Sequence, residues 1–374
     1  MKKIIIILII SLLIILGYGF WNTQKEEKQP VVSQEILEPE EKDEEEEEIP
    51  EPPKEDINIK FTAIGDIMCH NTQYNDAYDS KTGSYDFSYV FSDIKTYIDS
   101  ADIAIGNLET TFAGKDKGYS SYPQFNTPEQ LAMNLKNLGI DVVSTANNHC
   151  MDSRYTGLVS TLNYLDEAGI SHTGTNRSID EQNSILVKDV KGIKIAFLSF
   201  TYGTNGIPVP QDKSYAVNFI DKNLILEQIK LAKEQSPDLI CVSMHWGIEY
   251  QTKQNSEQED MANFLFQNGV NIILGSHPHV LQPMEKRDEG FVIYSLGNFM
   301  SGQTKPNTRD SIILNLDITK NGETGKVEIN NVDYVPIYMY KQSNVSKQRY
   351  KILDIRQNNS LKDEEIKIKG ILGM

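Results

Sequence analysis

Short apolar runs rich in isoleucine and valine recur from Ile57 onward and alternate with segments of helical pattern. Such alternation is typical of a domain in which helices cover the faces of β-sheets, because each strand needs a second layer against which to bury its apolar side chains. The sequence therefore predicts an α/β fold. We expect its strands at residues 57–64, 101–106, 140–145, 193–200, 238–243, 270–275, 291–296 and 311–318.

Two of the expected helices have recognisable boundaries. Residues 127–130, Thr-Pro-Glu-Gln, place a capping threonine before a proline at the first helical position, and Gly139 ends the helix. Residues 256–259 repeat the capping-box pattern ahead of a second helix, which Gly269 ends. Each of these helices leads directly into an apolar strand.

The amino terminus begins Met-Lys-Lys, and an almost unbroken apolar run then extends from Ile4 to Trp21. A run of this length is about what a helix needs to cross a bilayer. It exceeds the apolar region of a usual signal peptide, and neither a small-residue cleavage pattern nor a cysteine for lipidation follows. An uncleaved anchor over residues 1–22 is therefore favoured over a cleaved signal peptide. Since flanking lysines stay in the cytoplasm, Lys2 and Lys3 predict that the rest of the chain is extracytoplasmic.

Acidic residues dominate the segment that follows. Between Glu35 and Asp56 there are thirteen acidic residues and two lysines, so only about −6 of the formal net charge of −17 belongs to the rest of the chain. Repelling charges and interspersed prolines keep such a segment extended and unfolded. The acidity argues against nucleic acid as a partner. We predict a disordered linker at 23–56, a main domain at 57–340 and a C-terminal extension at 341–374.

The cysteines are Cys69, Cys150 and Cys241, an odd and small number for an exported domain of this size. No disulfide framework is implied. Cys69 and Cys150 each lie beside a histidine of the motifs described below, where they could pair. The favoured interpretation is that they are small buried hydrophobic side chains.

Side chains that can bind metals follow several of the predicted strands. In α/β proteins, sites form where the carboxyl ends of strands meet. Taken singly, each residue has an ordinary alternative: His70 as a loop histidine, Glu109 or Asp152 as a helix cap, and Glu249 as a support for its loop. Taken together, the clusters hold five of the six histidines, with carboxylates and amides that suit a divalent cation. The clusters span residues 66–70, 107–110, 147–152, 245–250 and 277–279.

In their order along the chain, six motifs resemble the CapA/PgsA family of capsule-biosynthesis proteins, which is associated with poly-γ-glutamate. The resemblance covers residues 58–320 and is specific in the combination of motifs. That family is similar to the calcineurin-like metallophosphoesterases, so the resemblance implies a two-sheet sandwich flanked by helices (α/β/β/α). The motifs are Gly65-Asp66, Asn107-Leu108-Glu109, Asn147-Asn148-His149, His245-Trp246-Gly247-x-Glu249-Tyr250, Gly275-Ser276-His277-Pro278-His279-Val280 and Tyr294-Ser295-Leu296-Gly297-Asn298-Phe299.

The resemblance further implies a site for two divalent cations and one proton donor. Glu109 takes the bridging position, and His149 is the catalytic residue that protonates the departing atom. The implied ligands of the first cation are Asp66, His70 and His279, those of the second are Asn148, His245 and His277, and the surrounding residues are Asn107, Asp152, Glu249 and Asn298.

Two features depart from the phosphoesterase pattern. Asp66 and His70 are four residues apart rather than two, and the bridging group is Glu109 rather than an aspartate. Both departures count against strict phosphoesterase activity. The mixed ligand set suits manganese, iron or zinc better than calcium or magnesium.

The resemblance predicts a membrane-anchored, extracytoplasmic component of the synthesis or export of poly-γ-glutamate or a related anionic polymer. Its expected partners are that polymer and the membrane synthase and transporter subunits of a capsule complex. Two alternatives stay open: a metal-dependent hydrolase acting on phosphoester or amide bonds of envelope polymers, and a non-catalytic scaffold for polymer binding or assembly.

Overall fold

The computed structural model of the protein describes residues 54–373. The predicted anchor at 1–22 and most of the predicted linker at 23–56 lie outside the described residues. Within residues 54–373, no helix combines the length and the apolar character that a bilayer crossing requires.

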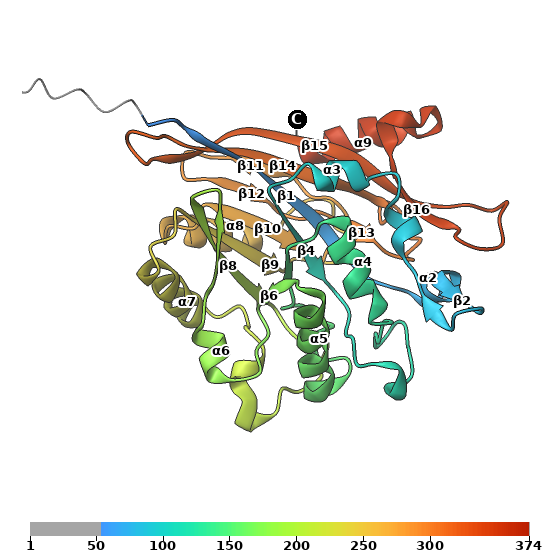
Figure 1. Cartoon of the computed structure of the whole chain (residues 1–374). Coiled ribbons are helices and arrows are strands. Elements are labelled where there is room, and N and C mark those ends of the chain that lie inside the picture. Colours follow the sequence, from blue (N-terminus) through green and yellow to red (C-terminus); the bar gives the residue numbers. More distant parts are fainter. Residues whose placement is uncertain (1–53, 374) are drawn as a thin grey trace, which may run out of the picture. The chain divides into compact units, whose positions relative to one another are not determined.

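The first sheet is built around strand β1, which lies between β4 and β14 (Figure 1). β1 pairs in parallel with β4 and antiparallel with β14, so a parallel half and an antiparallel half meet at this strand. β13 pairs with the end of β1. The strands are β1 (Ile57–Ile67), β4 (Ile103–Leu108), β5 (Val142–Ser144), β6 (Ser171–Thr173), β13 (Asn298–Met300), β14 (Asp310–Lys320), β15 (Val327–Lys341) and β16 (Tyr350–Asp354).

The second sheet has a parallel centre with an antiparallel strand at each edge. β8, β9, β10 and β12 are mutually parallel, whereas β7 and β11 run against their neighbours. A separate pair, β2 (Tyr78–Asp79) with β3 (Ser84–Tyr85), forms a small hairpin. The strands of the second sheet are β7 (Leu186–Val190), β8 (Ile193–Thr201), β9 (Leu239–His245), β10 (Ile272–Ser276), β11 (Met284–Lys286) and β12 (Phe291–Ile293).

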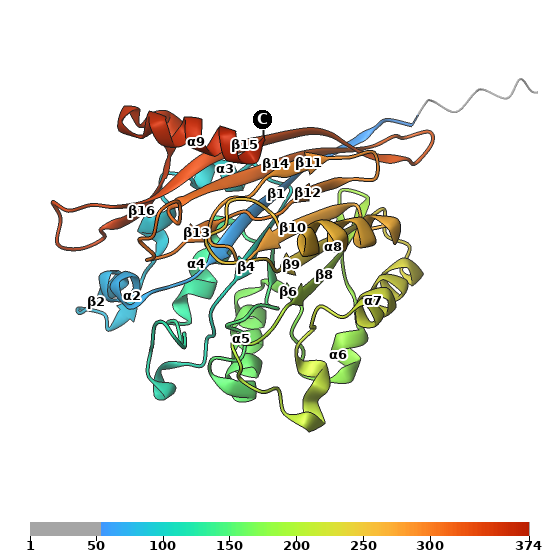
Figure 2. The same cartoon turned by 180° about the vertical axis from the view of Figure 1, so that it is seen from behind.

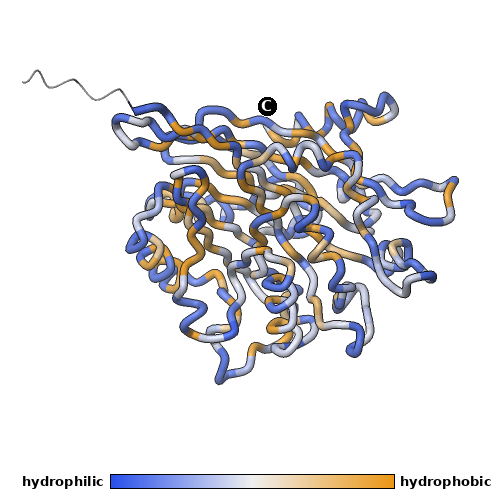
Figure 3. The backbone as a smooth tube through the Cα atoms, in the orientation of Figure 1, coloured by the Kyte–Doolittle hydropathy of each residue, from blue (hydrophilic) through white to orange (hydrophobic). Residues whose placement is uncertain are grey.

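The two sheets pack face to face, and helices cover their outer faces (Figures 1 and 2). Between the sheets, Phe61 of β1 stacks on Phe197 of β8 with ring centres 6.3 Å apart. Hydrophobic segments concentrate along these strands (Figure 3), whose apolar burial stabilises the sandwich. The predicted α/β fold with flanking helices is therefore confirmed. The helices are α2 (Asn71–Ala77), α3 (Lys95–Asp99), α4 (Gln130–Leu138), α5 (Arg154–Ala168), α6 (Ile179–Asn183), α7 (Lys222–Glu234), α8 (Ser256–Gln267) and α9 (Lys362–Leu372).

The helix starts differ in detail from those that the sequence predicts. α4 begins after Glu129, and Thr127 does not cap it; the Thr127 hydroxyl instead lies 2.7 Å from that of Thr110. In α8 the capping box is formed by Asn255 and Gln258, one position ahead of the predicted pattern. A polar side chain near a helix start caps it only if no closer partner competes for its hydroxyl or amide.

The segment 341–374, which we predict as a C-terminal extension, contributes β16 and α9. β16 pairs with β15, and α9 buries Ile368 and Leu372 in the core between the layers. Figures 1 and 2 both place α9 over β14 and β15.

All three cysteines are free and buried, and burial raises the pKa of each thiol. The favoured interpretation of Cys69 and Cys150 as buried apolar side chains agrees with this arrangement.

Candidate metal centre

The predicted clusters meet because they follow parallel strands. In the first sheet β1 is parallel to β4 and β4 to β5; in the second sheet β9 is parallel to β10. The carboxyl ends of neighbouring parallel strands lie at one edge of a sheet, where their loops converge. Backbone pairing sets Asp66 opposite Asn107 and His245 opposite Ser276.

The approach of the strand ends depends on glycine at Gly65. A β-carbon there would lie 1.9 Å from the carbonyl oxygen of Gly297, in the motif that precedes β13. The amide of the next residue, Asp66, donates a hydrogen bond of 2.8 Å to the same carbonyl. A side chain at position 65 would push these segments apart, so the motif glycine has a packing role.

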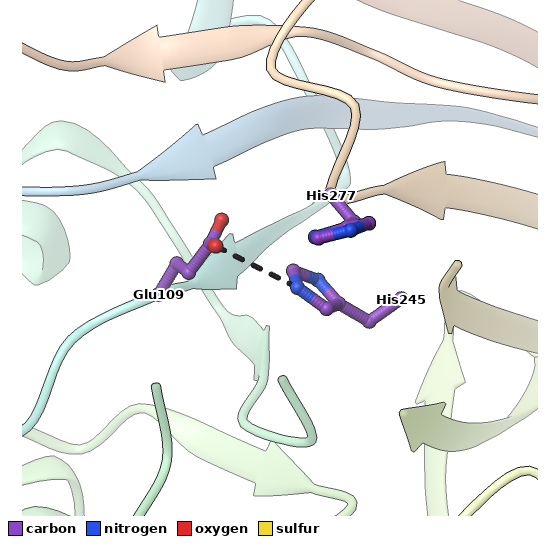
Figure 4. A group of neighbouring side chains, drawn as sticks. All are labelled: Glu109, His245 and His277. Carbon is purple, nitrogen blue, oxygen red and sulfur yellow. Dashed lines mark ion pairs between the residues drawn. The ribbon is translucent and has the colours of Figure 1, made fainter. Parts of the chain in front are cut away.

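One group of potential ligands consists of Glu109, His245 and His277 (Figure 4). Their ligand atoms lie within 4.8 Å of one another, and His245 Nε2 is 3.5 Å from Glu109 Oε1. The amide oxygen of Asn148 lies 3.1 Å from the same imidazole nitrogen. Four of the predicted residues therefore surround one position, and Asn148, His245 and His277 are those that the family resemblance assigns to the second cation.

A second group shares Glu109 and adds Asp66 and His279. His279 Nδ1 is 3.3 Å from Asp66 Oδ2, and its Nε2 is 3.9 Å from Glu109 Oε1. Because Glu109 belongs to both groups, its position agrees with the bridging role that the family resemblance implies.

The buried carboxylate and imidazole of these groups have lone pairs that a cation could bind. Both carboxylate oxygens of the fully buried Glu109 lack a hydrogen-bond donor among the described residues, as does the buried Nδ1 of His277. Burial, reinforced by the nearby Asp66, raises the pKa of Glu109 well above its ordinary value. A divalent cation would accept these lone pairs and offset the free-energy cost of burying a charged carboxylate. The residues therefore fit a metal centre.

The histidines are prepared to act as neutral ligands. Burial and the neighbouring His277 lower the pKa of His245 well below its ordinary value, and burial lowers the pKa of His277 to about 3. Neutral imidazole offers the lone pair that metals bind. The hydroxyl of Ser276 lies 2.9 Å from His245 Nδ1 and so orients this ring.

His277 and His279 adopt backbone angles that are unusual for residues with side chains. Their φ values are 97° and 59°. Positive φ costs a non-glycine residue about 1–3 kcal/mol, and such strain concentrates at functional sites. With this backbone conformation His277 lies in the first group and His279 in the second, although only Pro278 separates them.

The remaining predicted residues lie around these groups. His70 belongs to neither; its Nδ1 accepts a 3.0 Å hydrogen bond from the amide of Gly302, and burial lowers its pKa to about 4. The amide of Asn107 donates a 2.9 Å hydrogen bond to Asp66 and thereby orients it. Exposed Glu249 lies within 4.8 Å of the ligand atoms of His277 and His279.

Asn298 lies beside Asp66 in the pairing of β13 with β1. Its amide group donates hydrogen bonds to the carbonyl of Thr308 and to Gln303, whereas its Oδ1 has no donor among the described residues. The side chain thus braces the loop that leads into β14.

The predicted proton donor His149 is held by Asp152. Its Nδ1 lies 2.7 Å from Asp152 Oδ2, which also accepts a 2.6 Å hydrogen bond from the amide of Phe125. The interpretation of Asp152 as a helix cap was wrong, because Ser153 precedes the first residue of α5. With Nδ1 occupied, Nε2 is the ring nitrogen free for proton exchange.

Two residues near the centre were missed by the sequence analysis. Tyr202 and Asn205 follow β8, and both contact the amide of Asn148. The rule that sites gather at strand ends applies to β8 as well, but its loop holds neither histidine nor carboxylate to draw attention.

Comparison with solved structures supports the fold. A 5′-nucleotidase-like protein from Staphylococcus aureus aligns with a TM-score of 0.51 and 14% identity, covering 82% of this chain and 58% of that protein. Identity this low shows similarity of fold alone, which here is the mixed α/β sandwich.

Comparison of sequences is more specific. The model of the bacterial capsule synthesis protein family PGA_cap matches residues 60–303. Capsule biosynthesis protein CapA of Bacillus anthracis is 29% identical over 72% of this chain and 66% of its own length, and PGA biosynthesis protein CapA of Bacillus subtilis is 30% identical over 65% and 64%. The chain thus spans slightly less than two thirds of each relative. The predicted resemblance is confirmed, and the chain belongs to the bacterial capsule synthesis protein family PGA_cap.

Proposed function

We propose that this chain is a membrane-anchored, extracytoplasmic component of the synthesis or export of poly-γ-glutamate or a related anionic polymer, and that it acts through a centre of two divalent cations. One observation carries the metal part of the proposal: within residues 54–373, neither oxygen of the fully buried Glu109 has a hydrogen-bond donor, and three histidines and Asp66 lie within reach. A buried carboxylate in this setting is costly unless a cation joins it.

The biological part of the proposal draws on the relatives. Two are named for capsule or PGA biosynthesis, and a Mycobacterium tuberculosis relative with 24% identity is named a probable polyglutamine synthesis accessory protein. Poly-γ-glutamate carries carboxylates, which bind divalent cations such as manganese and zinc. The proposed partners are therefore this polymer and the membrane subunits that synthesise and export it.

The ligand set defines what each side chain does. Glu109 would be shared by both cations, Asn148 Oδ1 and His245 Nε2 would hold one of them, and Asp66 with His279 would hold the other. When bound, divalent cations supply Lewis acidity, which activates water and neutralises negative charge.

The test of the proposal is a complementation experiment in a strain that lacks its own copy of the gene. His245→Ala should abolish polymer output, whereas His172→Ala should preserve it, since His172 is the histidine outside the motifs and contacts Asp166. Equal output from both variants, with both proteins present at parental level, would refute a role for the metal centre.

A second candidate function is a metal-dependent hydrolase of phosphoester or amide bonds, and the His149–Asp152 contact favours it. Asp152 fixes the imidazole so that Nε2 can donate a proton to a leaving group. Purified protein should then release new chain ends from an anionic polymer, and His149→Ala should stop this release. Polymer binding without any release, in parent and variant alike, would favour the non-catalytic assembly role.

The proposed location depends on residues 1–22 and on the linker at 23–56. The parent should fractionate with the cell membrane and be degraded by protease added outside spheroplasts. Protection from the protease would contradict the proposed orientation. Loss of polymer output on deleting 23–56, with the shortened protein still anchored and folded, would show that the linker is more than a spacer.

A further inference from the structure

The amide of Asn148 can serve as a metal ligand only through its oxygen, so its orientation matters. The nitrogen Nδ2 donates hydrogen bonds to the hydroxyl of Tyr202, at 3.3 Å, and to Oδ1 of Asn205, at 3.2 Å. Oδ1 of Asn205 can only accept, so it selects the orientation of the Asn148 amide in which Asn148 Oδ1 points to His245. The Tyr202 hydroxyl, which can donate or accept, accepts in this arrangement. Oδ1 of Asn148 then lies 3.1 Å from His245 Nε2.

Tyr202 contacts the other two histidine ligands of the same position through its ring. The ring is nearly parallel to that of His245, with centres 6.1 Å apart and planes inclined by 7°. It is inclined by 48° to the ring of His277, with centres 4.5 Å apart. One tyrosine therefore touches Asn148, His245 and His277, which are three of the four side chains around this position.

The other cation position has no such support from this loop. Asp66 is oriented by Asn107 at 2.9 Å, and neither Tyr202 nor Asn205 forms a hydrogen bond with Asp66 or His279 within the described range. Tyr202 is also 50% exposed, so this residue is not a member of the buried hydrophobic core. The loop after β8 thus serves one half of the centre.

We infer that Tyr202 and Asn205 are positioning residues that hold Asn148, His245 and His277 in the geometry needed to bind the second cation. The inference depends on the metal-binding part of the proposed function and not on the identity of the polymer. Partners that orient a metal ligand typically contribute about 10–100-fold to metal affinity. Their loss should therefore weaken one cation and leave the other bound.

The experiment uses the full chain purified in detergent and loaded with Mn²⁺. Bound manganese is counted by elemental analysis at a series of free Mn²⁺ concentrations, and electron paramagnetic resonance distinguishes coupled pairs from isolated ions. Tyr202→Phe removes the hydroxyl but keeps the ring, and Asn205→Ala removes the second acceptor. Asn205→Asp keeps an acceptor oxygen, and Tyr122→Phe serves as the matched tyrosine control because Tyr122 is 74% exposed.

The parent, Asn205→Asp and Tyr122→Phe should bind two ions with a coupled signal. Tyr202→Phe and Asn205→Ala should retain one ion with an isolated signal, and the affinity for the second should fall about 10–100-fold. Two coupled ions at parental affinity in Tyr202→Phe, in Asn205→Ala and in the double variant would overturn the inference. Absence of manganese from the parent itself would overturn the metal part of the proposed function, and this inference with it.

Discussion

His149 and Asp152 form a buried pair in which Nδ1 and Oδ2 are 2.7 Å apart. The carboxylate is itself fixed by the backbone amide of Phe125, at 2.6 Å. The ring of Phe125 meets that of His149 edge-on, with centres 4.8 Å apart. His149 is thereby held in one orientation before any substrate arrives.

If His149 transfers a proton, Asp152→Asn should reproduce much of the defect of His149→Ala. Because positioned acid–base groups contribute about 10²–10⁴-fold, we expect polymer output or product release to fall by about 100-fold or more for His149→Ala. Metal content should stay at the parental level in both. Asp166→Asn is the control, since Asp166 makes the same kind of contact, at 3.2 Å, with His172. Parental activity in Asp152→Asn would contradict the proton-transfer role.

Metal affinity should rise with pH. The raised pKa of Glu109 means that metal-free protein holds a proton on this carboxyl above its ordinary range, and a cation must displace it. The pKa values of His70 and His277 are lowered to about 4 and 3, so these imidazoles are already neutral at the pH at which Glu109 loses its proton. Titration calorimetry in buffers of different ionisation enthalpy should detect proton release in the parent. Release that persists unchanged in Glu109→Gln would contradict the assignment.

The raised pKa of Glu109 also predicts how the stability of the metal-free protein depends on pH. Because the folded state holds the Glu109 proton more tightly than the unfolded state does, the free energy of unfolding should fall as pH rises from the ordinary carboxyl value through the raised one. Glu109→Gln should remove this decline and make the metal-free protein more stable at pH 8 by about 1 kcal/mol or more. The same variant should lose the stabilisation that added metal gives the parent. Denaturant titrations with and without chelator measure both effects, and parallel pH profiles for parent and variant would refute the prediction.

Gly65→Ala should strongly destabilise the fold, because its β-carbon would meet the backbone of Gly297 at 1.9 Å. Overpacking of this kind costs about 1–3 kcal/mol or more. Gly370→Ala is the matched control, since a β-carbon within α9 would meet nothing within 4 Å and alanine favours helix by about 1 kcal/mol. The midpoints of urea denaturation should shift in opposite directions. Equal midpoints for Gly65→Ala and the parent would show that the strand ends can separate at no cost.

The strands that carry the candidate site could be predicted because each apolar run is followed by a cluster of polar residues. Such clusters come together because the carboxyl ends of parallel strands lie at the same edge of a sheet. β1, β8 and β14 agree with the expected ranges within a few residues. The predicted strand 291–296 was too long, since β12 ends at Ile293. β15 was missed because much of it is exposed and the alternation of its apolar residues is interrupted at Asn330, an extra residue between the paired Ile329 and Asn331.

Contacts that form only in the folded chain explain which site residues the sequence analysis misjudged or missed. Asp152 follows a helix-start pattern, yet a histidine three residues earlier and a distant backbone amide determine its role. Tyr202 and Asn205 belong to no recognisable motif, and only the folded arrangement brings them to Asn148. Contacts between segments more than fifty residues apart leave no periodic signal in a single sequence.

Metal analysis of the purified chain tests the central claim most directly, with His245→Ala and His277→Ala measured in parallel. The account predicts about two manganese, iron or zinc ions per parental chain, consistent with a carboxylate shared by two ligand groups, and loss of at least one ion in each variant. A parent that binds no transition metal after reconstitution, although folded, would contradict it.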